Sequence, residues 1–302
     1  MGRELPVSHN RRGVLYAAAG LVAMGHLVVW ALAKWPDEEP GRPLIVPVAV
    51  SSVVTPAHVV SVAGGQGETA EGLLALAERD PEALVARGHE RYEREVRDYR
   101  CVLLKQERVE GVLLPAEEVE VRFRQTPLAI YMIWRQNASQ AKRVLFKDDP
   151  AFIDGEGNKL ARAEPAGAVV RLFVRDIFMP INGEHARRAS RRTIDECGFG
   201  PIFDLWERYN AKARAEGVLD VRFGGVGEVD GRPTFIVIRR LPYSGEGGAY
   251  PDAKLVMHLD QEWLLPVAIE SYADESGQEL LGRYVFTQVE LNPGLTEADF
   301  EF

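Results

Sequence analysis

Residues 254–302 read KLVMHLDQEWLLPVAIESYADESGQELLGRYVFTQVELNPGLTEADFEF, and this stretch decides the fold of the chain. Apolar residues recur there at every second position in three segments, which is the period of a half-buried β-strand. Polar turns separate the segments, and Gly277 can take the positive φ that a tight turn requires. The stretch predicts an antiparallel meander whose three strands cover residues 255–259, 266–269 and 284–289.

The same period of two recurs upstream of the meander. Val119, Val121 and Phe123 alternate with charged residues, which is the cleanest half-buried strand pattern in the chain. Residues 178–197 lose this periodicity and are predicted to form a loop. We expect the other strands at 102–105, 128–134, 143–147, 151–153, 168–174, 218–223 and 234–241.

Two regions have helical periodicity instead. Within residues 69–97, Asp80 is a typical N-cap and Pro81 takes the first helical position, so a helix is expected to restart there. Residues 201–216 place apolar side chains on one helix face and end before Gly217, a typical C-terminal stop. A chain with about ten strands and two substantial helices is expected to form an α+β domain.

The first 35 residues differ in composition from the rest. Residues 13–33 contain no charged side chain and are long enough to span the bilayer of the inner membrane. Arg11 and Arg12 precede this span and acids follow it, so the positive-inside rule places the N-terminus in the cytoplasm. We expect a cytoplasmic basic arm at 1–12, a single-pass transmembrane anchor at 13–35, a Pro/Gly-rich linker at 36–68 and a periplasmic or extracytoplasmic globular domain at 69–302.

Two other readings of the N-terminus stay open. Ala31-Leu32-Ala33 matches the small-residue pattern of a signal-peptidase site, so the span could be a cleaved export signal. Residues 10–15 partly resemble a twin-arginine export signal. All three readings place the globular domain outside the cytoplasm.

The composition argues against several classes of function. Outside residues 1–35 the chain carries 32 Lys and Arg against 44 Asp and Glu, which argues against nonspecific nucleic-acid binding. No two of the six histidines have metal-ligand spacing, and no nucleophile motif is present, so we expect no metal, no cofactor and no catalysis. His258 alternates with apolar residues and is expected on the polar face of its strand.

Cys101 and Cys197 are the only cysteines in the chain. In an oxidising compartment an even number of cysteines suggests a disulfide, although Cys101 within its strand would equally be a small buried hydrophobe. Because nothing in the sequence brings the two thiols together, both readings stay open.

Short motifs carry a resemblance to a known family. Asp98-Tyr99-Arg100-Cys101 is followed by Lys105-Gln106-Glu107-Arg108 and by RFRQTPLAIY at residues 122–131. This D-Y-x-C…K-x-E-R…R-x-x-P-x-x-x-Y pattern resembles an uncharacterised bacterial family, a domain of unknown function. That family is similar to the LolA/LolB-like and RseB-like superfamily of exported lipid-binding and lipoprotein-binding domains. The resemblance implies that residues 69–302 form a LolA-like domain: a large curved antiparallel sheet, a half-barrel, whose concave side is covered by helices and loops.

The resemblance also implies a ligand cavity. In that superfamily the apolar side chains of the concave face line a cavity for acyl chains. Without the resemblance, such side chains would be expected to pack together as a closed core. Four arginines in residues 187–192 stand out from an acidic domain and are candidates to bind a head group or an acidic partner. These arginines are Arg187, Arg188, Arg191 and Arg192. The candidate cavity residues are Val121, Phe123, Trp134, Leu255, Met257, Leu259, Val267, Ile269, Tyr284 and Phe286.

These expectations lead to one functional hypothesis and one alternative. The hypothesis is a membrane-tethered extracytoplasmic protein that binds a lipid, a lipoprotein or another apolar ligand without catalysis. The alternative is an envelope protein-interaction or sensing module whose interior is fully packed. The two differ in whether the concave face of the sheet encloses an unfilled cavity.

Overall fold

The computed structural model describes residues 69–171 and 173–302. The expected basic arm, transmembrane anchor and linker at 1–68 lie outside the described residues, and those expectations stay predictions. Within the described ranges, no helix has the length and apolar character needed to cross a membrane.

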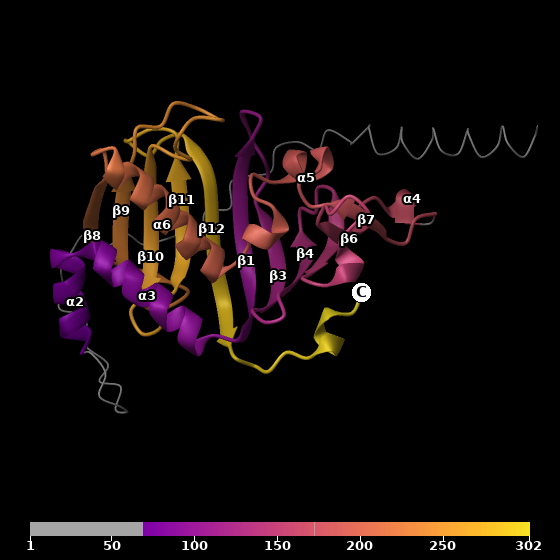
Figure 1. Cartoon of the computed structure of the whole chain (residues 1–302), viewed down its shortest axis with the longest axis horizontal. Coiled ribbons are helices and arrows are strands. Elements are labelled where there is room, and N and C mark those ends of the chain that lie inside the picture. The colour runs from indigo at the N-terminus through magenta and orange to yellow at the C-terminus, as the bar shows by residue number, and fades with distance from the viewer. Residues whose placement is uncertain (1–68, 172) are drawn as a thin grey trace, which may run out of the picture.

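One antiparallel sheet of twelve strands forms the body of the described domain (Figure 1). Its strands follow the order β7-β6-β5-β4-β3-β1-β12-β11-β10-β9-β8, and the short β2 pairs with β1 outside this series. The sheet is large and curved, which confirms the expected fold class. The strands are β1 (Asp98–Val109), β2 (Val112–Leu113), β3 (Glu117–Arg124), β4 (Ala129–Gln136), β5 (Ala141–Lys147), β6 (Leu160–Pro165), β7 (Ile177–Pro180), β8 (Asp220–Val229), β9 (Arg232–Arg240), β10 (Lys254–Asp260), β11 (Pro266–Tyr272) and β12 (Leu280–Leu291).

Helices cover the concave face of the sheet. In Figure 1, α3 and α6 lie across the half formed by β8 to β12, and α5 lies toward β3 to β6. The α-helices are α2 (Ala70–Arg79), α3 (Pro81–Glu95), α4 (Ala168–Arg171), α5 (Glu184–Ala189) and α6 (Phe199–Ala215). The 3-10 helices are η1 (Pro150–Phe152), η2 (Ile194–Glu196) and η3 (Glu297–Phe300).

β1 and β12 lie side by side at the centre of the sheet, although they come from opposite ends of the domain. Their register pairs Leu103 with Phe286 and Lys105 with Tyr284. Strands β3 to β7 extend the sheet outward from β1, and strands β8 to β11 extend it outward from β12. A single strand pair therefore unites the two halves of the sheet.

An aromatic cluster fixes α6 over this central pair. Tyr99 of β1 stacks on Phe123 of β3 with 4.8 Å between ring centroids, and it lies 4.7 Å from Phe199 of α6. Phe199 in turn lies 4.8 Å from Phe286 of β12. All four side chains are buried, so their contacts hold the first turn of α6 against the middle of the sheet.

Most of the regular pattern in the sequence is confirmed. Val119 and Phe123 are buried while their neighbours on β3 are half-buried. The Asp80 carboxylate accepts a hydrogen bond from Ala83 N at 3.0 Å and so caps α3. Gly217 follows α6 with a φ of +69°. The C-terminal meander is present as β10, β11 and β12.

The structure corrects the prediction at three short segments. Residues 151–153 belong to η1 and the position after it, because Pro150 favours a helical turn and the Asp149 carboxylate caps it. Residues 168–174 contain α4 rather than a strand, and the strand in this region is β6. Residues 178–197, expected as a loop, contain most of β7 as well as α5 and η2. Each helix or strand in these segments has six residues or fewer, which is too short for apolar periodicity to distinguish a strand from a helix.

His258 is buried, with 1% of its surface accessible, and so does not lie on an exposed polar face. Its Nδ1 lies 3.1 Å from Thr234 Oγ1, and its Nε2 has no hydrogen-bond partner among the described residues. Burial lowers the pKa of His258. The prediction was wrong because alternation tells which face a side chain takes, but not how closely neighbouring chain segments cover it.

α3 approaches the turn between β10 and β11 so closely that position 88 has no room for a side chain. A Cβ on Gly88 would collide with the carbonyl oxygen of Leu264 and would lie 3.3 Å from Phe203 Cζ. Gly72 in α2 offers a comparison, because a Cβ there would meet only Thr69 Oγ1 at 3.4 Å.

We expect Gly88→Ala to lower the free energy of unfolding by about 2 kcal/mol, because α3 must move away from the turn. The matched control Gly72→Ala is expected to leave it unchanged or to raise it by up to about 1 kcal/mol, since alanine favours the helix. Urea denaturation followed by circular dichroism measures both changes. Equal stability of the two variants would contradict the close approach of α3 to this turn.

Candidate functional site

A cavity of about 290 Å³ lies on the concave face of the sheet, next to α5, η2 and α6. Met132, Val144 and Ala163 line it from β4, β5 and β6, and Met257 and Phe286 line it from β10 and β12. The lining therefore comes from both halves of the sheet. Because the halves meet at the β1–β12 pair, the cavity depends on that pairing.

The structure places the ten candidate cavity residues in two different environments. Phe123 is packed against Tyr99, and a Cβ on Gly198 at the start of α6 would lie 3.1 Å from its ring. The concave face is therefore part cavity and part closed core. Six candidates line the cavity: Trp134, Leu255, Met257, Ile269, Tyr284 and Phe286. Four are buried in the core cluster and do not border the cavity: Val121, Phe123, Leu259 and Val267.

An ionic cluster of Lys105, Glu107 and Glu117 borders the cavity through Lys105 and Glu117. Lys105 Nζ lies 3.0 Å from Glu107 Oε2 and 3.1 Å from Glu117 Oε2. The Tyr284 hydroxyl donates a hydrogen bond of 2.5 Å to Glu107 Oε1, and Lys105 Nζ donates one of 3.4 Å to Ser190 Oγ. The side chain of Glu107 is only 2% exposed, so these charges interact with little screening by water.

Mutual attraction keeps the ionic cluster charged. Burial on its own lowers the pKa of Lys105, but the charges of Glu107 and Glu117 raise that pKa above its ordinary value. Burial on its own raises the pKa of Glu107, but the Lys105 charge and the Tyr284 hydrogen bond bring it below its ordinary value. Burial and the Glu107 charge raise the pKa of Tyr284, so its hydroxyl remains a neutral donor.

The four arginines of the 187–192 segment are divided between two locations. Arg191 and Arg192 line the cavity, whereas Arg187 and Arg188 on α5 do not border it. Arg187 donates a hydrogen bond of 2.8 Å to the backbone carbonyl of Asn182, and Arg188 pairs with Glu184 at 2.5 Å. The structure thus brings only half of the expected arginine cluster to the cavity.

Two donor atoms on residues that line the cavity have no acceptor among the described residues. Arg191 Nη2 donates to Pro251 O at 3.3 Å, but Arg191 Nη1 is buried without a partner. Trp134 Nε1 is also buried without a partner. A buried donor that lacks an acceptor costs about 1–3 kcal/mol, so a ligand that brought an acceptor to either atom would gain free energy.

Sequence reasoning missed the ionic cluster. It used Lys105 and Glu107 only as parts of a family motif, and it assigned no role to Glu117. The sequence does contain a signal for buried charges. Lys105 lies two residues from buried Leu103 on β1, and Glu117 lies two residues from buried Val119 on β3, so each charged residue is on the same strand face as a buried apolar one. A charged residue in an apolar stripe predicts that a partner compensates it, but the sequence does not identify that partner.

Cys101 and Cys197 are free thiols in the structure. Cys101 is buried on β1, and Cys197 lines the cavity. Burial raises the pKa of both thiols, to about 12 for Cys197. A disulfide between them stays a prediction. Across residues 69–171 and 173–302, no three His, Cys, Asp or Glu side chains form a group that could hold a metal ion.

We expect Lys105→Met to lower the free energy of unfolding by about 3 kcal/mol at about pH 7, because two buried carboxylates lose their counter-charge. The loss should be smaller at about pH 5. Without Lys105, burial raises the pKa of Glu107, so this carboxyl takes up a proton as the pH falls and the penalty decreases. Urea denaturation at both pH values measures the difference.

The matched control is Lys212→Met, which removes one partner of the exposed Lys212–Glu216 pair on α6. Its effect should stay below about 1 kcal/mol, as is usual for surface ion pairs. A loss for Lys105→Met that is as small as that of the control, or that is independent of pH, would contradict the role of the ionic cluster.

Comparison with solved structures finds only distant similarity. A complex of Pseudomonas aeruginosa MucA/MucB has 16% identity and a TM-score of 0.42, over 74% of this chain and 61% of that chain. The Mycobacterium tuberculosis lipoprotein LppX has 14% identity and a TM-score of 0.39, over 72% and 98%. A LolA superfamily protein from Nitrosomonas europaea has 9% identity and a TM-score of 0.29, over 73% and 97%. The match thus spans less than two thirds of the MucA/MucB complex chain.

Family membership rests on the sequence itself. No functionally curated protein matches the chain. Residues 96–302, which are more than half of the chain, match the family described as "Protein of unknown function (DUF1571)". This match confirms the resemblance that the D-Y-x-C and K-x-E-R motifs predict. The chain therefore belongs to the DUF1571 family of proteins of unknown function.

Proposed function

We propose that this protein is a non-catalytic binding protein that holds one apolar chain, such as the acyl chain of a lipid or lipoprotein, in the cavity beside α5 and α6. The observation that supports this proposal is the cavity of about 290 Å³, which remains after α3 and α6 have packed on the sheet. Ligand cavities in proteins usually measure about 300–1,000 Å³. This cavity is close to the lower limit of that range, so its volume suits a single chain.

The polar part of the wall would select the ligand at its head group. Arg191 Nη1 and Trp134 Nε1 are buried donors without an acceptor in the described part of the chain, and an ester carbonyl, a carboxylate or a phosphate would satisfy them. Arg192 also lines the cavity and lies 4.0 Å from Glu196. This proposal therefore assigns head-group binding to Arg191 and Arg192 and leaves out Arg187 and Arg188.

Binding is favoured over catalysis because Lys105, Glu107 and Glu117 are engaged with one another. Lys105 is held charged between two carboxylates, so it is not available as a nucleophile or a general base. Binding is also favoured over an interaction module with a fully packed interior. Such a module would leave no room for a guest, whereas the residues on this concave face border an unfilled cavity.

We also propose that residues 13–33 tether the domain to the inner membrane, with the domain on the periplasmic or extracytoplasmic side. The support is the uncharged length of this segment and the position of Arg11 and Arg12 before it. A tether of this kind would keep the cavity close to the lipids that it is proposed to take up.

The proposal predicts that the full-length chain binds a fluorescent fatty acid, dansyl-undecanoic acid, and that Ala163→Phe weakens this binding about tenfold or more. Ala163 lines the cavity, and a phenyl ring at this position would occupy the space of the ligand. Fluorescence titration measures the affinity. The matched control is Ala215→Phe at the exposed end of α6, which should bind as the unmodified chain does.

Mass spectrometry of lipids extracted from the purified full-length chain provides a second readout. We expect an acyl-containing species in about stoichiometric amount, and less of it in Ala163→Phe. Thermal unfolding of both variants shows that they fold. Absence of fatty-acid binding, or equal binding by a folded Ala163→Phe variant, would rule out the cavity as the binding site.

A further inference from the structure

A second pocket, of about 250 Å³, lies on the opposite face of β5 and β6. Val144 and Ala163 line the cavity on the concave face, so strand alternation places their neighbours Arg143 and Arg162 on the other face. We call this second site the arginine pocket. Its charged lining residues are Arg143, Arg162, Arg171, Arg175, Glu164 and Asp176.

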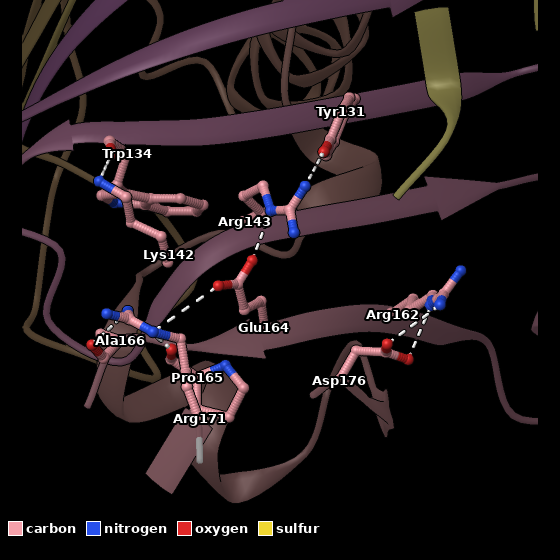
Figure 2. Close-up of polar contacts among 10 residues, drawn as sticks. All are labelled: Tyr131, Trp134, Lys142, Arg143, Arg162, Glu164, Pro165, Ala166, Arg171 and Asp176. Carbon is pink, nitrogen blue, oxygen red and sulfur yellow. Dashed lines mark hydrogen bonds and ion pairs between the residues drawn. The ribbon is translucent and has the colours of Figure 1, made fainter. Parts of the chain in front are cut away.

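Carboxylates orient two of the four arginines (Figure 2). Arg143 Nε donates to Glu164 Oε2 at 2.5 Å, and Arg143 Nη1 donates to Tyr131 OH at 3.2 Å. Arg162 donates two hydrogen bonds to Asp176, at 2.8 Å and 3.0 Å. These contacts fix both guanidinium groups while Arg143 Nη2 and Arg162 Nη1 keep no hydrogen-bond partner within the described residues.

The other two arginines have weaker contacts with the same two carboxylates. Arg171 donates to the backbone carbonyls of Pro165 and Ala166, at 3.4 Å and 2.7 Å, and its Nε stays 3.8 Å from Glu164 Oε1. Arg175 is exposed and has no hydrogen bond or ion pair within the described part of the chain. Four guanidinium groups thus share a pocket with two side-chain carboxylates, which leaves an excess of positive side-chain charge.

Phe302 holds two of these guanidinium groups near each other. The centroid of its ring lies 4.8 Å from Arg143 Cζ and 4.7 Å from Arg162 Cζ. The face of an aromatic ring attracts a cation, but it does not cancel the repulsion between two like charges. An anion bound between the arginines would reduce that repulsion.

We propose that the arginine pocket binds a phosphate group. A phosphate monoester carries a charge of about −1.5 to −2 at neutral pH, which complements the excess charge of the pocket. Guanidinium groups donate pairs of N–H bonds in a geometry that suits phosphate oxygens. This site lies on the other side of the sheet from the cavity, and it does not rest on the proposed function.

The phosphate could belong to a soluble ester or to a lipid head group. Phe178 on β7 is 48% exposed and is the register partner of Arg162 on β6. An exposed aromatic side chain therefore lies next to the arginine pocket, where it would contact the glycerol and first methylene groups of a lipid. We expect a lipid phosphate to bind more tightly than a soluble one for this reason.

Isothermal titration calorimetry of the full-length chain tests the proposal with two probes. Glycerol 1-phosphate has no acyl chain and reports on the arginine pocket alone, whereas dihexanoyl-phosphatidic acid, also a phosphate monoester, adds the lipid part. We expect Arg171→Gln/Arg175→Gln to weaken binding of both probes about tenfold, because it removes two charged donors. Arg222→Gln on β8, at the other edge of the sheet, is the matched control and should bind as the unmodified chain does.

Each outcome decides the proposal. Tighter binding of the lipid probe, lost in the double variant, supports a lipid head group, and equal binding of both probes supports a soluble phosphate ester. If neither probe binds, or if the folded double variant binds as the control does, the proposal is overturned. Ala163→Phe should leave the binding of glycerol 1-phosphate unchanged, so failure at the cavity and failure at the arginine pocket are distinguishable.

Discussion

The antiparallel pairing of β1 with β12 is the interaction on which the rest of the structure depends. On the β1 side of this pair the sheet continues with β3 to β7, which follow β1 in the chain. On the β12 side it continues with β8 to β11, which precede β12 in the chain. The register that sets Lys105 beside Tyr284 and Leu103 beside Phe286 also sets which side chains share the concave face. A shift by one residue would turn the apolar side chains of either strand to the opposite face.

The concave face combines closed core and cavity because its helices cover it unequally. Tyr99, Phe199 and Phe286 close the centre of the sheet under the first turn of α6. Toward β4 to β7, the cover consists of the short helices α5 and η2. The ionic cluster borders the cavity through Lys105 and Glu117, and burying its three charges is tolerable only because they compensate one another. The site is thus apolar along most of its wall and polar at defined atoms.

Much of the fold could be predicted from the sequence, and the errors have a physical explanation. Long alternating segments such as 117–124 and 280–291 specify strands, because a period of two recurs often enough to exclude a helix. The segments at 151–153 and 168–174 contain too few residues for that test. His258 was misplaced because alternation carries no information on how neighbouring strands cover a face. Glu117 was missed because its partner Lys105 comes from a different strand.

The sequence by itself determined the number and type of the long elements, the capped helix after Asp80, the uncharged segment at 13–33 and the membership of the family. These properties depend on residues that are close in the chain. Only the tertiary structure decided that six candidate residues border a cavity while four belong to the core. It also decided that Arg191 lies at the cavity while Arg187 does not. In the same way, it brought arginines from β5, from β6 and from the segment after β6 into one pocket. Those outcomes depend on which distant segments pair, and pairing over long distances in the chain is not encoded in any local pattern.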